Sequence, residues 1–149
     1  MTATPDIEQF DMVVVGAGFA GLYMIYRARQ CGLSVQCYEI GEREGGTWYW
    51  NRYPGARVDI ECVEYSYSFS KELEQEWDWS ERYASQPEIE RYANHVAERF
   101  DLRRDIQFKT RVTATHFEEG TQRWLVETDT GERVSARFCS MATGLISAP

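Results

Sequence analysis

The first forty residues carry apolar runs and a helical pattern that together predict a strand, a helix and a second strand. Residues 10–15 end in three consecutive valines and lead directly into a glycine, which is typical of a short strand buried on both faces. Residues 20–31 contain no proline and carry apolar side chains at helical spacing, so we expect a helix that stops near Gly32. Residues 35–39 predict the second strand. Such a unit has parallel strands and a right-handed crossover.

The middle of the chain combines a long irregular segment with one strongly patterned helix. Residues 40–70 are rich in glycine, proline and aromatic side chains without a clean period, so we expect a loop that wraps a ligand. After it, Ser85 is expected to cap a helix, with Glu88 completing a capping box and Pro87 in the first turn. The core-facing stripe of this helix is made of Ile89, Tyr92, Ala93, Val96, Ala97 and Phe100.

The final part of the chain predicts strands. Residues 106–109 are expected to form a third parallel strand. Three alternating segments follow, separated by glycine-containing turns, and they predict a three-stranded antiparallel meander. These segments are 112–117, 124–128 and 133–137. A further apolar run, 138–142, closes at Thr143-Gly144. The predicted fold class is therefore α/β, a Rossmann-like parallel sheet with a three-stranded antiparallel meander.

Composition narrows the possible partners. A chain of 149 residues with 43 % apolar side chains is one domain's worth and can bury one sizeable core. A net charge of −8 argues against nucleic acid and anionic membrane surfaces. The four cysteines and two histidines lack metal-binding spacing, so we expect no metal, and buried, reduced thiols in a cytoplasmic protein. We expect no signal peptide or membrane segment, because acidic residues precede the uncharged stretch 12–26 and glycines interrupt it.

The turn after the first strand fits the dinucleotide-binding pattern G-x-G-x-x-G. It reads Gly16-Ala17-Gly18-Phe19-Ala20-Gly21. The first glycine allows the tight turn, the second lets a diphosphate approach, and the third packs helix on strand. Glu39 follows at the end of the second strand, where a carboxylate accepts hydrogen bonds from ribose hydroxyls and disfavours a 2′-phosphate. A glycine-rich turn beside an ordinary strand-end acid is the alternative interpretation.

The order of elements after the second strand separates NAD from FAD. A simple nicotinamide dehydrogenase would continue with alternating strands and helices. This chain continues instead with the aromatic loop, one helix, the meander and a strand that ends in Met141-Ala142-Thr143-Gly144. That order resembles the flavoproteins with two dinucleotide-binding domains, where a glycine pair with a nearby arginine, here Arg43-Glu44-Gly45-Gly46, follows the second strand. The resemblance implies FAD.

A tryptophan-rich run gives a more specific resemblance. The run is Gly46-Thr47-Trp48-Tyr49-Trp50-Asn51-Arg52-Tyr53-Pro54-Gly55-Ala56-Arg57, followed by Asp59, Tyr65 and Ser68-Phe69. It closely resembles type I Baeyer–Villiger monooxygenases, especially those that act on phenylacetone and steroid ketones. The resemblance covers essentially the whole chain. It implies an enzyme that uses FAD, NADPH and O2 to insert one oxygen atom next to a ketone carbonyl, giving an ester or lactone.

The resemblance also implies that the chain is incomplete. The family fingerprint F-x-G-x-x-x-H-x-x-x-W-P, the second glycine fingerprint for NADPH and the substrate region would all follow Pro149. Residues 1–149 are therefore expected to be the N-terminal part of the FAD-binding domain, inactive by itself. Its partners would be the remainder of the enzyme and a small-molecule ketone. A related flavin enzyme that oxygenates nitrogen or sulfur, and an FAD-binding module without catalysis, stay open as alternatives.

The resemblance assigns individual residues to the cofactor. The glycine turn would hold the diphosphate and Glu39 the ribose of the adenosine half. Residues 46–50 would follow the ribityl chain and the flavin, Asp59 and Tyr65 would lie near the isoalloxazine, and the backbone of Val112 would contact adenine. The implied cofactor-binding residues are Gly16, Ala17, Gly18, Phe19, Ala20, Gly21, Glu39, Gly46, Thr47, Trp48, Tyr49, Trp50, Asp59, Tyr65 and Val112. Plain core packing is the alternative for each aromatic residue.

Asp59 carries the catalytic hypothesis. The resemblance implies that it is an electrostatic organiser, which orients an arginine from the nicotinamide domain toward the anion formed when oxygen reacts with the flavin. Arg57 and Asp59 would both face NADP. From the residues alone, the two look like a buried ion pair, Asp59 is also a candidate helix cap before Ile60, and Arg57 a surface cation.

Two further features are expected to be structural. Residues 77–83 interleave aromatic and charged side chains, which favours packing against a partner domain. His95 lies beside the helical stripe and His116 lies on a meander strand.

Overall fold

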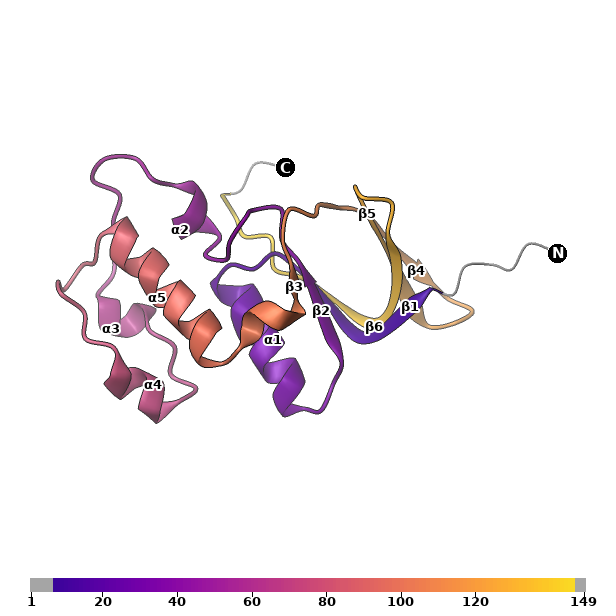
Figure 1. The fold of residues 1–149 in the computed structure, drawn as a ribbon, viewed down its shortest axis with the longest axis horizontal. Coiled ribbons are helices and arrows are strands. Elements are labelled where there is room, and N and C mark those ends of the chain that lie inside the picture. Colours follow the sequence, from indigo (N-terminus) through magenta and orange to yellow (C-terminus); the bar gives the residue numbers. More distant parts are fainter. Residues whose placement is uncertain (1–6, 147–149) are drawn as a thin grey trace.

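The computed structural model describes residues 7–146, which form one six-stranded mixed sheet with helices at one side (Figure 1). The strand order is β3-β2-β1-β6-β5-β4. The strands are β1 (Glu8–Val15), β2 (Val35–Tyr38), β3 (Ile106–Gln107), β4 (Val112–Glu118), β5 (Arg123–Thr128) and β6 (Arg133–Met141). The helices are α1 (Phe19–Gln30), α2 (Thr47–Trp50), α3 (Cys62–Tyr65), α4 (Lys71–Glu76), α5 (Gln86–Arg99) and the 3-10 helix η1 (Leu102–Asp105). The predicted α/β class is confirmed.

The strand–helix–strand unit at the start of the chain is confirmed. β1 pairs in parallel with β2 from Met12 opposite Val35 to Val15 opposite Tyr38. α1 connects the two strands and buries Leu22 against the sheet. β1 lies between β2 and β6, which explains why its last four side chains, from Met12 to Val15, are all apolar.

The last strand in the sequence is one long strand, where the sequence predicts two separate segments. Residues 133–137 and 138–142 were expected to be separate, whereas β6 runs without a break from Arg133 to Met141. Its first half pairs antiparallel with β5, and its whole length pairs in parallel with β1. A strand has two hydrogen-bonding edges, so one strand serves both the meander and the parallel sheet. The charged Arg137 is no interruption, because it is exposed and pairs with Asp11 at 3.1 Å.

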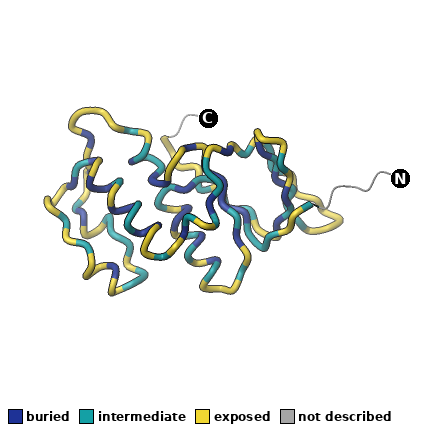
Figure 2. The backbone as a smooth tube through the Cα atoms, viewed as in Figure 1, coloured by how far each residue is buried: buried dark blue, intermediate teal, exposed yellow. Residues whose placement is uncertain are grey.

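The core lies on both faces of the parallel strands. Figure 2 marks the buried residues along the chain. On one face α1 and α5 pack against β1 and β2, and the buried side chains include Val14, Ile25 and Val96. On the other face the meander packs against Val13 and Tyr38. This second cluster is completed by Val126, Val134 and Ala136.

The long segment after β2 is not a plain loop, which corrects the prediction. It contains the single-turn helices α2 and α3, and α4 follows with Ser70 as its N-cap, accepting from the Leu73 N–H at 3.2 Å. A single turn of helix is too short to show a period in the sequence, which explains the miss. The segment has a small core of its own, built from Trp48, Val58, Cys62, Ala84 and Ile89.

The start of α5 differs from the predicted capping box. Ser85 is the N-cap residue, but its side chain makes no capping hydrogen bond. The Glu88 carboxylate instead accepts from the N–H and the hydroxyl of Ser80, at 2.9 and 2.7 Å. Pro87 lies in the first turn as predicted, and the apolar stripe from Ile89 to Ala97 is buried. The Glu88 carboxylate thus bonds to the two donors of Ser80 in the preceding loop and not to the start of its own helix.

Two smaller findings complete the fold. Cys37 and Cys62 are buried free thiols as expected, whereas Cys31 is exposed because it follows the last turn of α1. Within residues 7–146, the structure contains no helix with the length and apolar character needed to cross a membrane.

Candidate functional site

The first glycine turn connects β1 to α1 and is built so tightly that side chains cannot fit. A Cβ atom on Gly16, whose φ is +100°, would lie 2.6 Å from the carbonyl oxygen of Ala142. A Cβ on Gly21 would lie 1.9 Å from the carbonyl oxygen of Gly16. Neither approach is possible for another residue, so these two glycines close the turn and seat the helix on the strand.

The start of α1 presents unpaired donors. Gly18 is the N-cap residue, and no side chain caps this end of the twelve-residue helix. The first N–H groups of a helix have no partner inside it, and its dipole leaves positive potential there. An anionic group such as a diphosphate fits this position.

Glu39 lies beside the first glycine turn, as its position at the end of β2 predicted. The carboxylate is 5 % exposed and accepts from the N–H of Ala17 at 2.7 Å and from the N–H of Gly41 at 2.7 Å. Each carboxylate oxygen has a further lone pair available for a sugar hydroxyl. The side chain therefore fixes the turn and has acceptor capacity left for a ligand.

A second glycine turn, Gly45-Gly46, meets the first one backbone to backbone. The N–H of Gly45 donates to the carbonyl oxygen of Ala17 at 3.0 Å. A Cβ on Gly46, whose φ is 56°, would lie 2.8 Å from the Cα of Gly18. The two turns are separated by more than twenty residues in sequence. Their backbones thus form one surface, here called the cradle, with no side chain between Gly18 and Gly46. This cradle places α2 next to the start of α1.

The aromatic residues of α2 divide into buried and exposed members. Trp48 is 8 % exposed and belongs to the core with Ile89, and its indole N–H donates to the Tyr65 hydroxyl at 2.6 Å. Burial raises the pKa of Tyr65, against the opposing effect of the Trp48 hydrogen bond. Trp50 is 54 % exposed, with its ring edge-on to Tyr49. Core packing thus accounts for the position of Trp48, whereas the ring of Trp50 is an exposed aromatic surface.

Arg57 and Asp59 do not form the predicted buried ion pair. Both are exposed, and Arg57 instead pairs with Glu81 at 3.1 Å and donates to the carbonyl oxygen of Tyr83 at 2.8 Å. Asp59 is not a helix cap either, because Glu61 is the N-cap residue of α3. The negative charge of Asp59 reaches Tyr65, where it helps to raise the pKa of the hydroxyl.

Val112 begins β4, close to the end of β2. Two residues earlier, the N–H of Thr110 donates to the carbonyl oxygen of Glu39 at 3.0 Å. This bond brings the start of the meander next to Glu39.

Comparison with known proteins gives the family likeness. Residues 14–74 match a family model described as an NAD(P)-binding Rossmann-like domain. A Baeyer–Villiger monooxygenase of Pseudooceanicola batsensis is 49 % identical over 140 residues, which cover 93 % of this chain and 26 % of that protein. The predicted resemblance to Baeyer–Villiger monooxygenases is confirmed. The chain spans about a quarter of the length of the curated relatives it matches.

Two solved structures share the fold of this chain. An oxidized steroid monooxygenase bound to NADP has a TM-score of 0.93 at 60 % identity, covering 95 % of this chain and 27 % of that one. A complex of OTEMO with FAD and NADP has a TM-score of 0.89 at 47 % identity, covering 93 % and 26 %.

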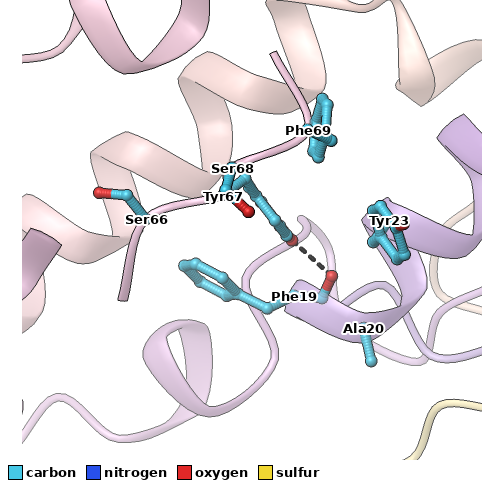
Figure 3. A pocket seen from close by; sticks show the side chains of 7 residues that line it. All are labelled: Phe19, Ala20, Tyr23, Ser66, Tyr67, Ser68 and Phe69. Carbon is cyan, nitrogen blue, oxygen red and sulfur yellow. Dashed lines mark hydrogen bonds between the residues drawn. The ribbon is translucent and has the colours of Figure 1, made fainter. Parts of the chain in front are cut away.

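An aromatic groove opens beside the cradle in this Baeyer–Villiger-like fold. It has a volume of about 420 Å³ and lies between the first turns of α1 and residues 66–69 (Figure 3). The Tyr67 hydroxyl donates to the carbonyl oxygen of Phe19, and the two rings stack with centroids 5.3 Å apart. Phe19 and Ala20 of the glycine fingerprint thus line this groove, on the outer side of α1.

Residues 77–83 pack as predicted, but against the same chain. The rings of Trp77 and Trp79 lie 5.4 and 5.0 Å from the Tyr92 ring on α5. The expectation of a partner domain is corrected for these two residues, because α5 supplies the surface. His95 stacks beside Trp77 and lies 3.7 Å from Glu76, which fits its predicted structural role.

Two buried polar residues beside the Baeyer–Villiger-like run were missed from the sequence. Gln86, at the start of α5, donates its side-chain amide to the carbonyl oxygen of Trp48 and so holds the end of α2. Glu44, just before the second glycine turn, is 1 % exposed and pairs with Arg103. Neither has a local sequence signal, since the partners come from distant elements. Their position next to motif residues was the only available hint.

Proposed function

We propose that the complete protein is an FAD- and NADPH-dependent Baeyer–Villiger monooxygenase that inserts one oxygen atom of O2 next to a ketone carbonyl. The product is an ester or lactone. In this proposal residues 1–149 are the N-terminal part of its FAD-binding domain, and the regions that bind NADPH and the ketone lie elsewhere in the enzyme. Free thiols at Cys37 and Cys62 suit a reducing compartment, so we place the enzyme in the cytoplasm.

One observation carries the proposal. The glycine turns meet with Gly46 against Gly18 at the uncapped start of α1, and the aromatic turn α2 follows directly. A dinucleotide needs a close backbone approach for its diphosphate and flat apolar surface for its ring, and this arrangement offers both. The identity of 60 % to a steroid monooxygenase bound to NADP supports the same conclusion.

The residues of this chain then have separate roles toward FAD. The N–H groups at the start of α1 bind the diphosphate, and Glu39 accepts from the ribose hydroxyls. Residues 46–50 and Tyr65 enclose the ribityl chain and flavin, with Trp48 held in place by Tyr65. The backbone of Val112 contacts adenine. Bound FAD, reduced by NADPH, supplies the oxygen chemistry, and the protein orients it and excludes water.

The activity is tested with the complete protein, FAD and NADPH. A ketone panel including acetone, cyclohexanone and a steroid ketone covers the substrates named for similar proteins. We expect a flavin absorbance spectrum, ketone-dependent NADPH consumption and esters or lactones by mass spectrometry. Oxidation of an amine or sulfide with no ketone turnover would replace this function by that of a nitrogen- or sulfur-oxygenating enzyme. Bound flavin without NADPH consumption would leave a binding module.

Asp59 is the residue of this chain that we assign to catalysis, as an electrostatic organiser. It is exposed, lies near Tyr65 and is free to face an arginine from another part of the enzyme and the NADP. Asp59→Ala is expected to retain FAD but to lower ester formed per NADPH consumed by about tenfold, with hydrogen peroxide released instead. Asp78→Ala, an exposed acid in the 77–83 segment, is the matched control. An unchanged ester yield in Asp59→Ala would refute this role.

A further inference from the structure

An ion pair between the buried Glu44 and the half-buried Arg103 directly precedes the second glycine turn. Glu44 is 1 % exposed, and its Oε1 accepts from Nε and Nη2 of Arg103 at 3.0 and 2.6 Å. The same guanidinium reaches the carbonyl oxygen of Asn94 on α5 at 3.4 Å. The other carboxylate oxygen of Glu44 is buried and has no hydrogen-bond partner within residues 7–146. Arg103 therefore supplies the charge compensation that a buried carboxylate requires.

The turn that follows is hydrogen-bonded to α2, since the N–H groups of Trp48 and Tyr49 donate to the carbonyl oxygens of Gly45 and Gly46 at 3.1 and 3.0 Å. Gly45 and Gly46 have φ values of 128° and 56°, and glycine restricts the backbone less than any other residue. One hydrogen bond, from the Gly45 N–H to Ala17, joins the turn to the first glycine loop. The close approach of Gly46 to Gly18 thus depends on how the neighbouring residue, Glu44, is held.

The partner of Glu44 is itself fixed independently. η1, which carries Arg103, is tied to α1 through Arg29, whose guanidinium binds Asp105 and the carbonyl oxygens of Phe100 and Asp101. Loss of the Glu44 contact would leave these bonds in place. Its effect is therefore expected at the glycine turn and not across the fold.

We propose that the Glu44–Arg103 ion pair is a positioning device for FAD, which holds the Gly45-Gly46 turn against Gly18 so that the cradle for the diphosphate is preformed. The inference rests on the proposed function for the identity of the ligand. It assigns a role to two residues that do not contact the cofactor. They act through the glycine turn, and the binding free energy of FAD depends on them because a preformed site avoids the cost of ordering the turn.

The test compares Glu44→Gln and Arg103→Gln with Arg104→Gln in the complete protein. Arg104 lies on the same η1, is 64 % exposed and pairs with Asp101 at 3.4 Å instead of Glu44, so it controls for the loss of an arginine from this helix. Hydrogen–deuterium exchange of the flavin-free protein reads the mobility of residues 45–48, and a flavin titration gives the dissociation constant of FAD. Glu44→Gln and Arg103→Gln are expected to raise exchange in this segment and to weaken FAD binding by about tenfold. Arg104→Gln should change neither.

A conservative variant separates positioning from general stability. Arg103→Lys keeps the charge but not the two-donor geometry, and it should restore part of the FAD affinity lost in Arg103→Gln. It also serves if Glu44→Gln does not fold. Unchanged exchange at residues 45–48, or a lower melting temperature with unchanged FAD affinity, would overturn the positioning role. Failure of the unaltered protein to bind FAD would refute the proposed function, and exchange would still decide whether the pair holds the turn.

Discussion

At the scale of single residues, the glycines set the geometry of the candidate site. Gly16, Gly18 and Gly21 were identified from their spacing alone, and the structure gives steric reasons for the first and the third. The role of Gly46 depends on where Gly18 lies in space. Sequence spacing therefore found the turn, and only the fold revealed the contact between the two turns.

The cradle leads to a prediction for Gly46. Gly46→Ala places a Cβ 2.8 Å from Gly18 at φ 56° and ψ −118°, a conformation that is essentially restricted to glycine. We expect a loss of about 2–5 kcal/mol in the free energy of unfolding and loss of FAD binding. Gly55 has φ +83° with nothing within 4 Å of its Cβ position, so Gly55→Ala should cost about 1–2 kcal/mol and retain FAD affinity. Urea unfolding measures the change in stability, and flavin titration measures the change in FAD affinity. Equal effects of Gly46→Ala and Gly55→Ala would contradict a steric role for Gly46.

Charged residues were harder to predict than glycines. The Arg57–Asp59 pair was wrong because Glu81, 24 positions away, lies nearer to the guanidinium in space. Glu39 was placed correctly because the end of a β-strand beside a glycine turn fixes its position. The position of a charged residue at the end of a strand is predictable from topology. The partner of a charged residue in an irregular segment is set only when the chain folds.

At the scale of elements, a buried carboxylate fixes the start of α5. Ser85→Ala removes no capping hydrogen bond and should cost less than about 0.5 kcal/mol of unfolding free energy. Glu88→Ala removes the acceptor for both Ser80 donors from a buried position and should cost about 1–3 kcal/mol. Urea unfolding followed by circular dichroism measures both variants. An equal cost for the two would mean that the capping box forms after all.

β6 shows the same limit at the level of strands. Its two halves have different neighbours, since the first half pairs with both β5 and β1 and the second half pairs with β1 alone. Local periodicity therefore divides a strand that is continuous in space. The helical stripe of α5 was predictable because a single buried face governs all fourteen residues.

At the scale of the whole molecule, the two-sided core leads to a prediction of alkaline sensitivity. Tyr38 is buried between the parallel strands and the meander, and its hydroxyl has no hydrogen-bond partner among the described residues. Burial, with the nearby charge of Glu132, raises the pKa of this hydroxyl well above its usual value of 10. The unfolded chain releases the proton first, so the stabilising contribution is complete below pH 10 and is lost as the pH rises further.

Replacing the hydroxyl tests this account. Tyr38→Phe is expected to leave stability nearly unchanged at pH 7, because the hydroxyl is unpaired, and to reduce the stability loss above pH 10. Tyr53→Phe, on an exposed ring, should leave the pH profile as it is. The measurement is the free energy of unfolding in urea across the alkaline range. A Tyr38→Phe protein that is as alkali-sensitive as the unaltered one would show that other groups dominate.

The sequence by itself determined the strand–helix–strand unit, the glycine turn, Glu39, the stripe of α5 and the resemblance to Baeyer–Villiger monooxygenases. The structural features among these depend on the spacing of residues that are close in the sequence, and the resemblance depends on the tryptophan-rich run. Only the tertiary structure decided the contact of Gly46 with Gly18, the pairing of Glu44 with Arg103, the partner of Arg57 and the double role of β6. Each of these joins residues separated by many positions, and local chemistry cannot choose among distant partners before the chain has packed.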